Sequence, residues 1–349
     1  MMNRIIEEDL KSIIKTPLPW RSFENKTVLI SGANGFLPAY MVHILLFLND
    51  TILKKKVKVI AVCRNRKRAL DKFAGYMKRK DFKLIIQDIC EPVTVKDTVD
   101  YIVHAASQAS PKYYGSDPVG TILPNVLGTY NLLELARAKK SKGFLFFSSG
   151  EVYGELGNSQ IPTKESDHGY VDPLNVRSCY AEGKRAGENM CVSWQHQYGV
   201  PAKIIRLYHT YGPGMRLDDG RVFADFVSNI VNKKDIVMKS DGSAKRVFCY
   251  IADATIGMFL VLLKGRPAEA YNLGNDKCEV SIIQLARMMT KLFPEMGLKV
   301  IRKSVQPAGY IRSRIKRSCP DISKIRTLGW EPEFGLKEGF KRTIMSFLS

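Results

Sequence analysis

The sequence lacks long apolar runs. The longest run near the start, residues 40–48, contains His43 and is shorter than the roughly 18 apolar residues that a membrane span requires. Residues 1–25 carry charges and prolines where a secretory signal needs an apolar region. We therefore expect no membrane span, no signal peptide and a cytoplasmic location.

A regular arrangement of cysteines is also missing. The chain has 7 cysteines, an odd number, with no Cys-x-x-Cys pair and no even spacing. Disulfide frameworks and zinc sites both need paired or regularly spaced cysteines. We therefore predict free thiols and no metal site.

Acidic residues are scarce relative to basic ones. The chain has 34 Asp and Glu against 54 Lys and Arg, a net charge of +20. Such a charge can attract nucleic acid, a membrane surface or a small ligand with phosphates. The excess is spread along the chain, and no recognised nucleic-acid module accompanies it. We expect a phosphate-bearing small ligand and no nucleic-acid partner, with much of the charge being solvated surface.

Short apolar runs alternate with helical stretches over the first two thirds of the 349 residues. Helices are expected at 40–48, 125–138 and 180–198. Runs typical of parallel strands stand at 27–31, 57–63, 83–86, 101–105, 143–148 and 203–207. This order predicts an α/β fold, a Rossmann-type doubly wound parallel sheet with a smaller C-terminal substrate-binding lobe.

Changes in this pattern suggest three segments. Residues 1–25 form an N-terminal helical leader, in which Pro17 and Pro19 end the helix before the first strand. Residues 26–207 form the dinucleotide-binding domain with the catalytic motif. Glycines, prolines and charges break the alternation after about residue 210. Residues 208–349 are therefore mainly a substrate-binding lobe, partly interleaved with the preceding domain.

A glycine-containing turn follows the first predicted strand and opens a helix. Gly32 and Gly35 let backbone N–H groups approach a pyrophosphate at the helix N-terminus. Pro38 stands where a third glycine is expected, and proline is allowed in the first turn of a helix. Because a glycine pattern alone is weak evidence, the strand before it and the helix after it carry the prediction of a dinucleotide site.

The end of the second strand lacks the acidic residue that commonly holds the ribose hydroxyls of NAD. Cys63, Arg64 and Arg66 stand there instead. Arginine suits the 2′-phosphate of NADP. We expect tightly bound NAD or NADP, with the arginines favouring NADP.

Tyr180 and Lys184 lie four residues apart on a predicted helix and so share one face. A free tyrosine has a pKa of about 10, and a nearby ammonium lowers it. The pair can therefore take a proton from a sugar hydroxyl while hydride leaves the same carbon. Ser149, at the carboxyl end of the fifth strand, would hydrogen-bond that hydroxyl and Tyr180.

In this combination the chain resembles the extended short-chain dehydrogenases, the NAD-dependent epimerase/dehydratase family, over roughly residues 26–345. The likeness is carried by the segments 32–35, 106–111, 149–154, 177–185, 210–216, 219–222, 245–248, 272–275 and 328–332. It implies a nucleotide-sugar substrate, a reaction through transient oxidation at C4, and a homodimer formed by helices 125–138 and 180–198.

The residues after Ser149 distinguish the reactions of this family. Dehydratases have an Asp-Glu pair there and 4-epimerases generally lack the glutamate. This chain has Gly150 and Glu151. Glutamate without aspartate resembles the decarboxylases of UDP-glucuronate, although those usually have serine at position 150. Open alternatives are a 4-epimerase, a 4,6-dehydratase, an NADPH-dependent 4-keto-sugar reductase, and a redox-inactive nucleotide-sensing or scaffold protein.

The resemblance also assigns roles to individual residues. The predicted catalytic residues are Ser149, Glu151, Tyr180 and Lys184. The predicted cofactor contacts are Gly32, Asn34, Gly35, Phe36, Leu37, Arg64, Asp88, Ile89, Ala105, Ala106, Ser107, Tyr180 and Lys184. The predicted substrate contacts are Ser110, His209, Arg216, Arg221, Val222 and Arg246. Arg246 would lie near the diphosphate or the sugar carboxylate, and His209 replaces a common asparagine.

Overall fold

A parallel sheet forms the centre of the molecule in the computed structural model, which describes residues 2–238, 240–302 and 315–348. Within these residues the sheet has seven strands in the order β10-β6-β5-β4-β1-β2-β3, and every neighbouring pair is parallel. The strands are β1 (Thr27–Ser31), β2 (Lys58–Cys63), β3 (Phe82–Ile86), β4 (Tyr101–His104), β5 (Gly143–Ser149), β6 (Ala202–Leu207) and β10 (Ala270–Leu273). This arrangement confirms the predicted doubly wound α/β fold.

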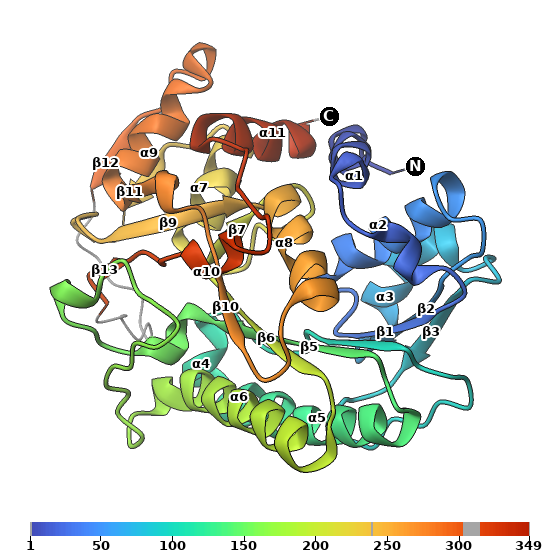
Figure 1. The fold of residues 1–349 in the computed structure, drawn as a ribbon. Helices are drawn as coiled ribbons and strands as arrows, with labels where there is room; N and C mark the ends of the chain where they lie inside the picture. Colours follow the sequence, from blue (N-terminus) through green and yellow to red (C-terminus); the bar gives the residue numbers. More distant parts are fainter. Residues whose placement is uncertain (1, 239, 303–314, 349) are drawn as a thin grey trace.

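Helices cover both faces of the sheet, as Figure 1 shows. One face carries α5 (Pro118–Lys139) and α6 (Cys179–Tyr198), which lie side by side. The other face carries α2 (Phe36–Thr51) and α8 (Ile251–Lys264). Alternate residues of β1 therefore enter two different cores, Leu29 on one side and Ile30 on the other. Burial on both faces explains why the strands are continuous apolar runs.

Helix α5 begins seven residues before the predicted stretch 125–138. The Asp117 carboxylate accepts a hydrogen bond from the Gly120 N–H at 3.0 Å, and Pro118 occupies the first helical position. Both features favour a helix start. Pro124 inside the helix obscured this start in the sequence, because an interior proline is usually a breaker.

The second lobe consists of two small sheets and the helices around them. Among the described residues, β9 (Lys245–Tyr250) pairs in parallel with β7 (His209–Tyr211) and β13 (Arg317–Ser318) and antiparallel with β11 (Glu279–Ser281). Another pair joins β8 (Ile236–Met238) to β12 (Val300–Arg302). The helices are α7 (Val222–Val231), α9 (Ile282–Lys291), α10 (Ser323–Arg326) and α11 (Leu336–Leu348). Strand β10 returns from this part of the chain to the large sheet, so the two parts are interleaved.

The first helix, α1 (Arg4–Lys15), packs beside the last helix, α11 (Figure 1). Its Asp9 is completely buried and accepts hydrogen bonds from Tyr40 at 3.2 Å, Tyr250 at 2.9 Å and Arg342 at 2.8 Å. Burial raises the pKa of Asp9, and the Arg342 charge opposes that shift. This network ties the predicted leader to the body of the molecule.

Within the described ranges, no helix is both long and apolar enough to cross a membrane. All seven cysteines are free thiols. The same ranges contain no cluster of three or more His, Cys, Asp or Glu side chains that could hold a metal ion.

Candidate active site

A cleft of about 970 Å³ opens at the carboxyl ends of the central strands. Its walls come from the turn after β1, the ends of β2, β4 and β5, helix α6, and the loops of the second lobe. Ligands bind at this end of open parallel sheets because the loops after the strands diverge there. The cleft therefore contains the expected site.

The turn between β1 and α2 requires glycine for two reasons. Gly32 has a φ of +62°, and a Cβ there would lie 2.7 Å from the Cα of Ala106. Gly35 caps α2 and lines the cleft with Phe36 and Pro38, so the N-terminus of the helix faces the cavity. Pro38 is the third helical residue, where its missing N–H breaks no helical hydrogen bond. The turn retains its anion-binding geometry without the third glycine.

Basic side chains gather where the second strand ends. The Cys63 thiol lies under the glycine turn beside backbone N–H groups, and burial raises its pKa to about 11, so it is neutral. Arg64 lies 3.6 Å from the Asp88 carboxylate. Arg68 and Lys72 of α3 (Arg66–Phe73) line the same end of the cleft. This end of the cleft therefore has three basic side chains, Arg64, Arg68 and Lys72. Cys63 stands at the position where an acidic residue would hold the ribose of NAD.

The residues present fit a dinucleotide. Besides the helix N-terminus and the close-approach glycine, the cleft wall contains Ser107, whose buried hydroxyl has no hydrogen-bond partner within the described part of the chain. A buried polar group without a partner costs free energy, which a ligand's polar atom would recover. All predicted cofactor contacts line this cleft: Gly32, Asn34, Gly35, Phe36, Leu37, Arg64, Asp88, Ile89, Ala105, Ala106, Ser107, Tyr180 and Lys184.

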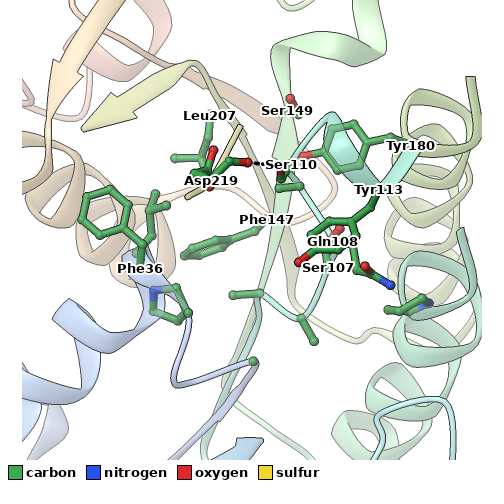
Figure 2. A pocket seen from close by; sticks show the side chains of 18 of the residues that line it. Phe36, Ser107, Gln108, Ser110, Tyr113, Phe147, Ser149, Tyr180, Leu207 and Asp219 are labelled. Atoms are coloured by element: carbon green, nitrogen blue, oxygen red, sulfur yellow. Dashed lines mark hydrogen bonds between the residues drawn. The ribbon is translucent and has the colours of Figure 1, made fainter. Parts of the chain in front are cut away.

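Tyr180 and Ser149 meet at the centre of the cleft. Tyr180 points from α6 into the pocket toward Ser149 (Figure 2), and their side chains are hydrogen-bonded. Lys184 lies one helical turn further on, with its ammonium 5.7 Å from the centre of the Tyr180 ring. That ammonium donates to the Phe147 carbonyl at 2.5 Å, and burial lowers the pKa of Lys184 to about 7. The structure thus brings together the three side chains that the sequence motif predicted.

The electrostatics at Tyr180 include a contribution that sequence reasoning missed. Burial raises the pKa of Tyr180 to about 12, while the hydrogen bond with Ser149 and the positive charge of Arg221 lower it. Arg221 comes from the second lobe, 41 residues after Tyr180 in the sequence. The sequence around Tyr180 does not indicate this cation, because only the folded chain brings Arg221 close to the tyrosine.

Glu151 lies beside Tyr180 in a short turn that follows β5. Its backbone N–H donates to the Ser149 hydroxyl at 3.2 Å, and its carboxylate lies 3.6 Å from the Arg177 guanidinium. That guanidinium stands 5.3 Å from the centre of the Tyr114 ring. Tyr114 in turn stacks on Tyr180, with ring centres 5.1 Å apart. Arg177 and Tyr114 thus fix Glu151 and Tyr180 relative to one another.

Gly150 has a steric explanation. A Cβ at this position would lie 3.0 Å from the ring of Tyr208, which also lines the cleft. Contacts this short force the neighbouring side chain to move. The Tyr208 ring therefore occupies the space that a larger residue at position 150 would need.

The predicted substrate contacts come from the second lobe and from the loop before α4 (Lys112–Ser116). Ser110 donates to the backbone carbonyl of Asp219 (Figure 2). Arg221 pairs with the Asp219 carboxylate at 3.0 Å, and Arg216 pairs with Asp218 at 2.8 Å. These pairs hold the guanidinium groups at the cleft wall before any ligand binds.

His209 and Arg246 also line the cleft. His209 packs near the rings of Phe223 and Phe248, and burial lowers its pKa to about 3, so the imidazole is neutral. Arg246 donates to the Ile315 carbonyl at 2.6 Å.

Val222, the first residue of α7, is not among the described residues that line the cleft. Its predicted role as a substrate contact stays a prediction.

The glycine turn and the Ser149, Tyr180 and Lys184 group define a dehydrogenase-type site on a Rossmann fold. Residues 28–274 match the model of the "NAD dependent epimerase/dehydratase family". The chain belongs to this family, as its resemblance indicated.

Individual relatives show which enzymes of this family the chain is similar to. The chain is 34% identical to UDP-glucuronic acid decarboxylase 3 of Arabidopsis thaliana over 334 residues, which covers 93% of this chain and 91% of the relative. It is 33% identical to UDP-glucuronic acid decarboxylase 1 of Xenopus tropicalis, covering 93% of this chain and 72% of the relative. These relatives are nucleotide-sugar enzymes of the same family, so the chain is an enzyme of this type.

Solved structures support the fold. UDP-glucose 4-epimerase of Thermotoga maritima, solved with UDP-glucose, superposes with a TM-score of 0.78 at 22% identity, covering 92% of this chain and 98% of the epimerase. UDP-glucuronic acid 4-epimerase of Bacillus cereus, solved with UDP-glucuronic acid and NAD, gives 0.75 at 23% identity, with coverage of 92% and 98%. At this level of identity the likeness establishes the common architecture.

Proposed function

We propose that this enzyme decarboxylates UDP-glucuronate through transient oxidation at C4. The observation that carries the proposal is that Glu151 lies near Tyr180, held by Arg177, while position 150 is a glycine whose neighbour, the Tyr208 ring, crowds any side chain there. A dehydratase needs an acid at position 150 to expel water. The relatives at 33–34% identity, which are UDP-glucuronic acid decarboxylases, support the same assignment.

The side chains divide the proton transfers among them. Tyr180, as phenolate, accepts the proton of the sugar 4-hydroxyl, with Ser149 hydrogen-bonded to both oxygens. A dinucleotide held by the turn at Gly32 and Gly35 would supply the acceptor for the C4 hydride and its later return. Oxidation makes the 4-ketone β to the C5 carboxylate, so the C5–C6 bond breaks and carbon dioxide leaves with the electron pair held as an enolate. Glu151 would pass a proton taken up from solvent to C5, and return of the hydride would leave no net redox change.

The test of this function is a panel of nucleotide sugars incubated with the enzyme and analysed by mass spectrometry. We expect UDP-glucuronate to lose the mass of carbon dioxide. Loss of water would instead identify a dehydratase, and an unchanged mass with a changed sugar would identify a 4-epimerase. A gain of two hydrogens with NADPH would identify the reductase, and no conversion of any sugar would contradict an enzymatic role.

For the cofactor, we propose that NADP is accepted beside NAD, with the 2′-phosphate at the basic end of the cleft. Arg64, Arg68 and Lys72 line that end, and the neutral Cys63 leaves it without a competing anion at that position. Guanidinium groups hold phosphates through charge-assisted hydrogen bonds.

Arg64→Ala is therefore expected to weaken NADP binding about 10-fold or more and to change NAD binding little, since a hydrogen bond to a charged group contributes about 1.5–3 kcal/mol. Calorimetric titration with both dinucleotides measures this selectivity. Arg66→Ala is the matched control, because Arg66 is exposed and is not among the described residues at the cleft wall. Equal losses for NAD and NADP in the Arg64 variant would contradict the assignment.

We also propose a homodimer through α5 and α6. Exposed apolar side chains follow one side of α5, at Val119, Leu123, Leu127 and Tyr130. Their spacing of three and four residues places them on a single helical face, and Val192 of α6 is exposed as well. Contiguous exposed apolar surface is typical of a protein interface, and a two-fold dimer would pair this face with itself.

Leu127→Glu is expected to convert the dimer to a monomer, because it places a charge in the centre of the apolar face. Light scattering after gel filtration measures the mass. Met345→Glu, an equally exposed apolar position on α11, should keep the dimer. A wild-type protein that elutes as a monomer would refute the proposal.

A further inference from the structure

A buried ion pair lies directly behind the catalytic lysine. Glu188 is one helical turn after Lys184 on α6, and its carboxylate accepts three hydrogen bonds. Arg206 of β6 donates two of them, at 2.9 and 2.7 Å, and the Ser148 hydroxyl donates the third at 2.5 Å. Glu188, Arg206 and Ser148 are each at most 9% exposed. The pair is therefore rigid and almost dry.

Fold stability alone gives little reason for such a pair. Removing two charges from water costs several kcal/mol, and apolar side chains of similar size often stabilise a core as well. Arg206 also donates to the Tyr153 hydroxyl at 3.0 Å, and Tyr153 donates to Asn272 of β10 at 2.7 Å. Three strands and a helix thus hold the Glu188 carboxylate at one place, although the proposed chemistry does not use it directly.

Lys184 is the site residue that this carboxylate influences. Burial lowers the pKa of Lys184, and the negative charge of Glu188 opposes that shift. The other titratable groups facing the ammonium are Tyr180 and Cys191 on α6 and His104 on β4. Burial raises the pKa of Cys191 and lowers that of His104 to about 3, so both are neutral at neutral pH.

The remaining elements around Lys184 add no charge. Strand β5 contributes the Phe147 carbonyl, which accepts from the ammonium, and the Phe146 ring, 4.9 Å from it. On α5 the side chain that faces the neighbouring Gly183 is the amide of Asn125. The balance of charge at Lys184 therefore rests on Glu188 and on the guanidinium that holds it.

We propose that Glu188 and Arg206 form a positioning pair that keeps the Lys184 ammonium charged and aimed at the cofactor side of Tyr180. Glu188 supplies the negative charge. Arg206 and Ser148 occupy the lone pairs of that carboxylate, so it does not pull the ammonium away from the Phe147 carbonyl. This role rests on the proposed function of Lys184 in the Tyr180 reaction.

Opposite charge changes provide the test. Glu188→Gln removes the attraction and should lower the pKa of Lys184. The alkaline limb of the pH–rate profile should then shift to lower pH by about one pH unit, which is a tenfold change in the protonation equilibrium of the lysine. Arg206→Met leaves the carboxylate uncompensated and should move the same limb upward. Ser148→Ala removes one hydrogen bond to the carboxylate without changing charge, so it should move the limb upward by less than Arg206→Met does.

A purely structural role predicts something different. All three variants would then lose stability and turnover together, with no shift of the limb or with shifts of the same sign, and that outcome would overturn the proposal. If Arg206→Met does not fold, Glu188→Asp replaces it. Glu188→Asp keeps the negative charge, so its alkaline limb should stay at the wild-type pH, whereas the limb of Glu188→Gln shifts.

A second readout needs no substrate. In protein labelled with carbon-13 at lysine Cε, the Lys184 signal, assigned by its loss in Lys184→Arg, should titrate at lower pH in Glu188→Gln and at higher pH in Arg206→Met. Unchanged titration would refute the pair's role. If the wild-type enzyme converted no nucleotide sugar while these shifts appeared, the proposed function would fail and the positioning pair would stand.

Discussion

Tyr180→Phe is expected to reduce turnover by about 1,000-fold or more while dinucleotide affinity changes little. General acid–base groups contribute about 100- to 10,000-fold, and the Tyr180 hydroxyl is the group that receives the first proton in the proposed reaction. Phenylalanine keeps the ring that stacks on Tyr114, so the local packing should survive. The loss should therefore appear in kcat and not in folding.

The measurement combines steady-state kinetics with calorimetric titration of the dinucleotide and a melting curve. Tyr170→Phe is the matched control, since Tyr170 is exposed and is not among the described residues at the cleft wall. The control should keep wild-type kcat. Wild-type turnover in Tyr180→Phe would refute the mechanism, and a shared loss of dinucleotide binding would show that the hydroxyl also holds the dinucleotide.

Much of the fold could be predicted because its signals are local. Strands such as 27–31 and 143–149 are buried on both faces, so each is an uninterrupted apolar run that the sequence displays directly. The glycine turn at Gly32 is also local, because a positive φ and a close backbone approach leave only glycine. Tyr180 and Lys184 share a helical face, so their proximity follows from spacing alone.

The parts that could not be predicted depend on residues far apart in the chain. Gly150 looked like a missing acid, and only the structure reveals the Tyr208 ring against it. Arg221 influences the pKa of Tyr180 although it lies 41 residues further along the sequence, in a different lobe. The Glu188–Arg206 pair joins a helix to a strand whose sequence is mostly apolar. Such contacts have no periodic signature, since the fold and not the spacing brings them together.

The site also separates oxidation from the step that follows it, and Glu151→Gln is expected to expose this separation. Glutamine keeps the size of the side chain and can still contact Arg177, but it cannot deliver a proton to C5. Tyr180, Ser149 and Lys184 are untouched, so oxidation at C4 should continue. We expect protonation at C5, and with it formation of the final sugar, to slow by about 100-fold or more.

The measurement is a single-turnover experiment with UDP-glucuronate, following reduced dinucleotide by absorbance and the sugar by mass spectrometry. The variant should accumulate reduced dinucleotide after carbon dioxide is lost, because the slow step now lies at the protonation of C5. Glu182→Gln is the control, a carboxylate on α6 that pairs with Arg185 at 3.7 Å and is not among the described cleft residues. If Glu151→Gln instead stopped oxidation and decarboxylation equally, Glu151 would act in the first proton transfer together with Tyr180, and the reaction would no longer be determined by the residue beside Gly150.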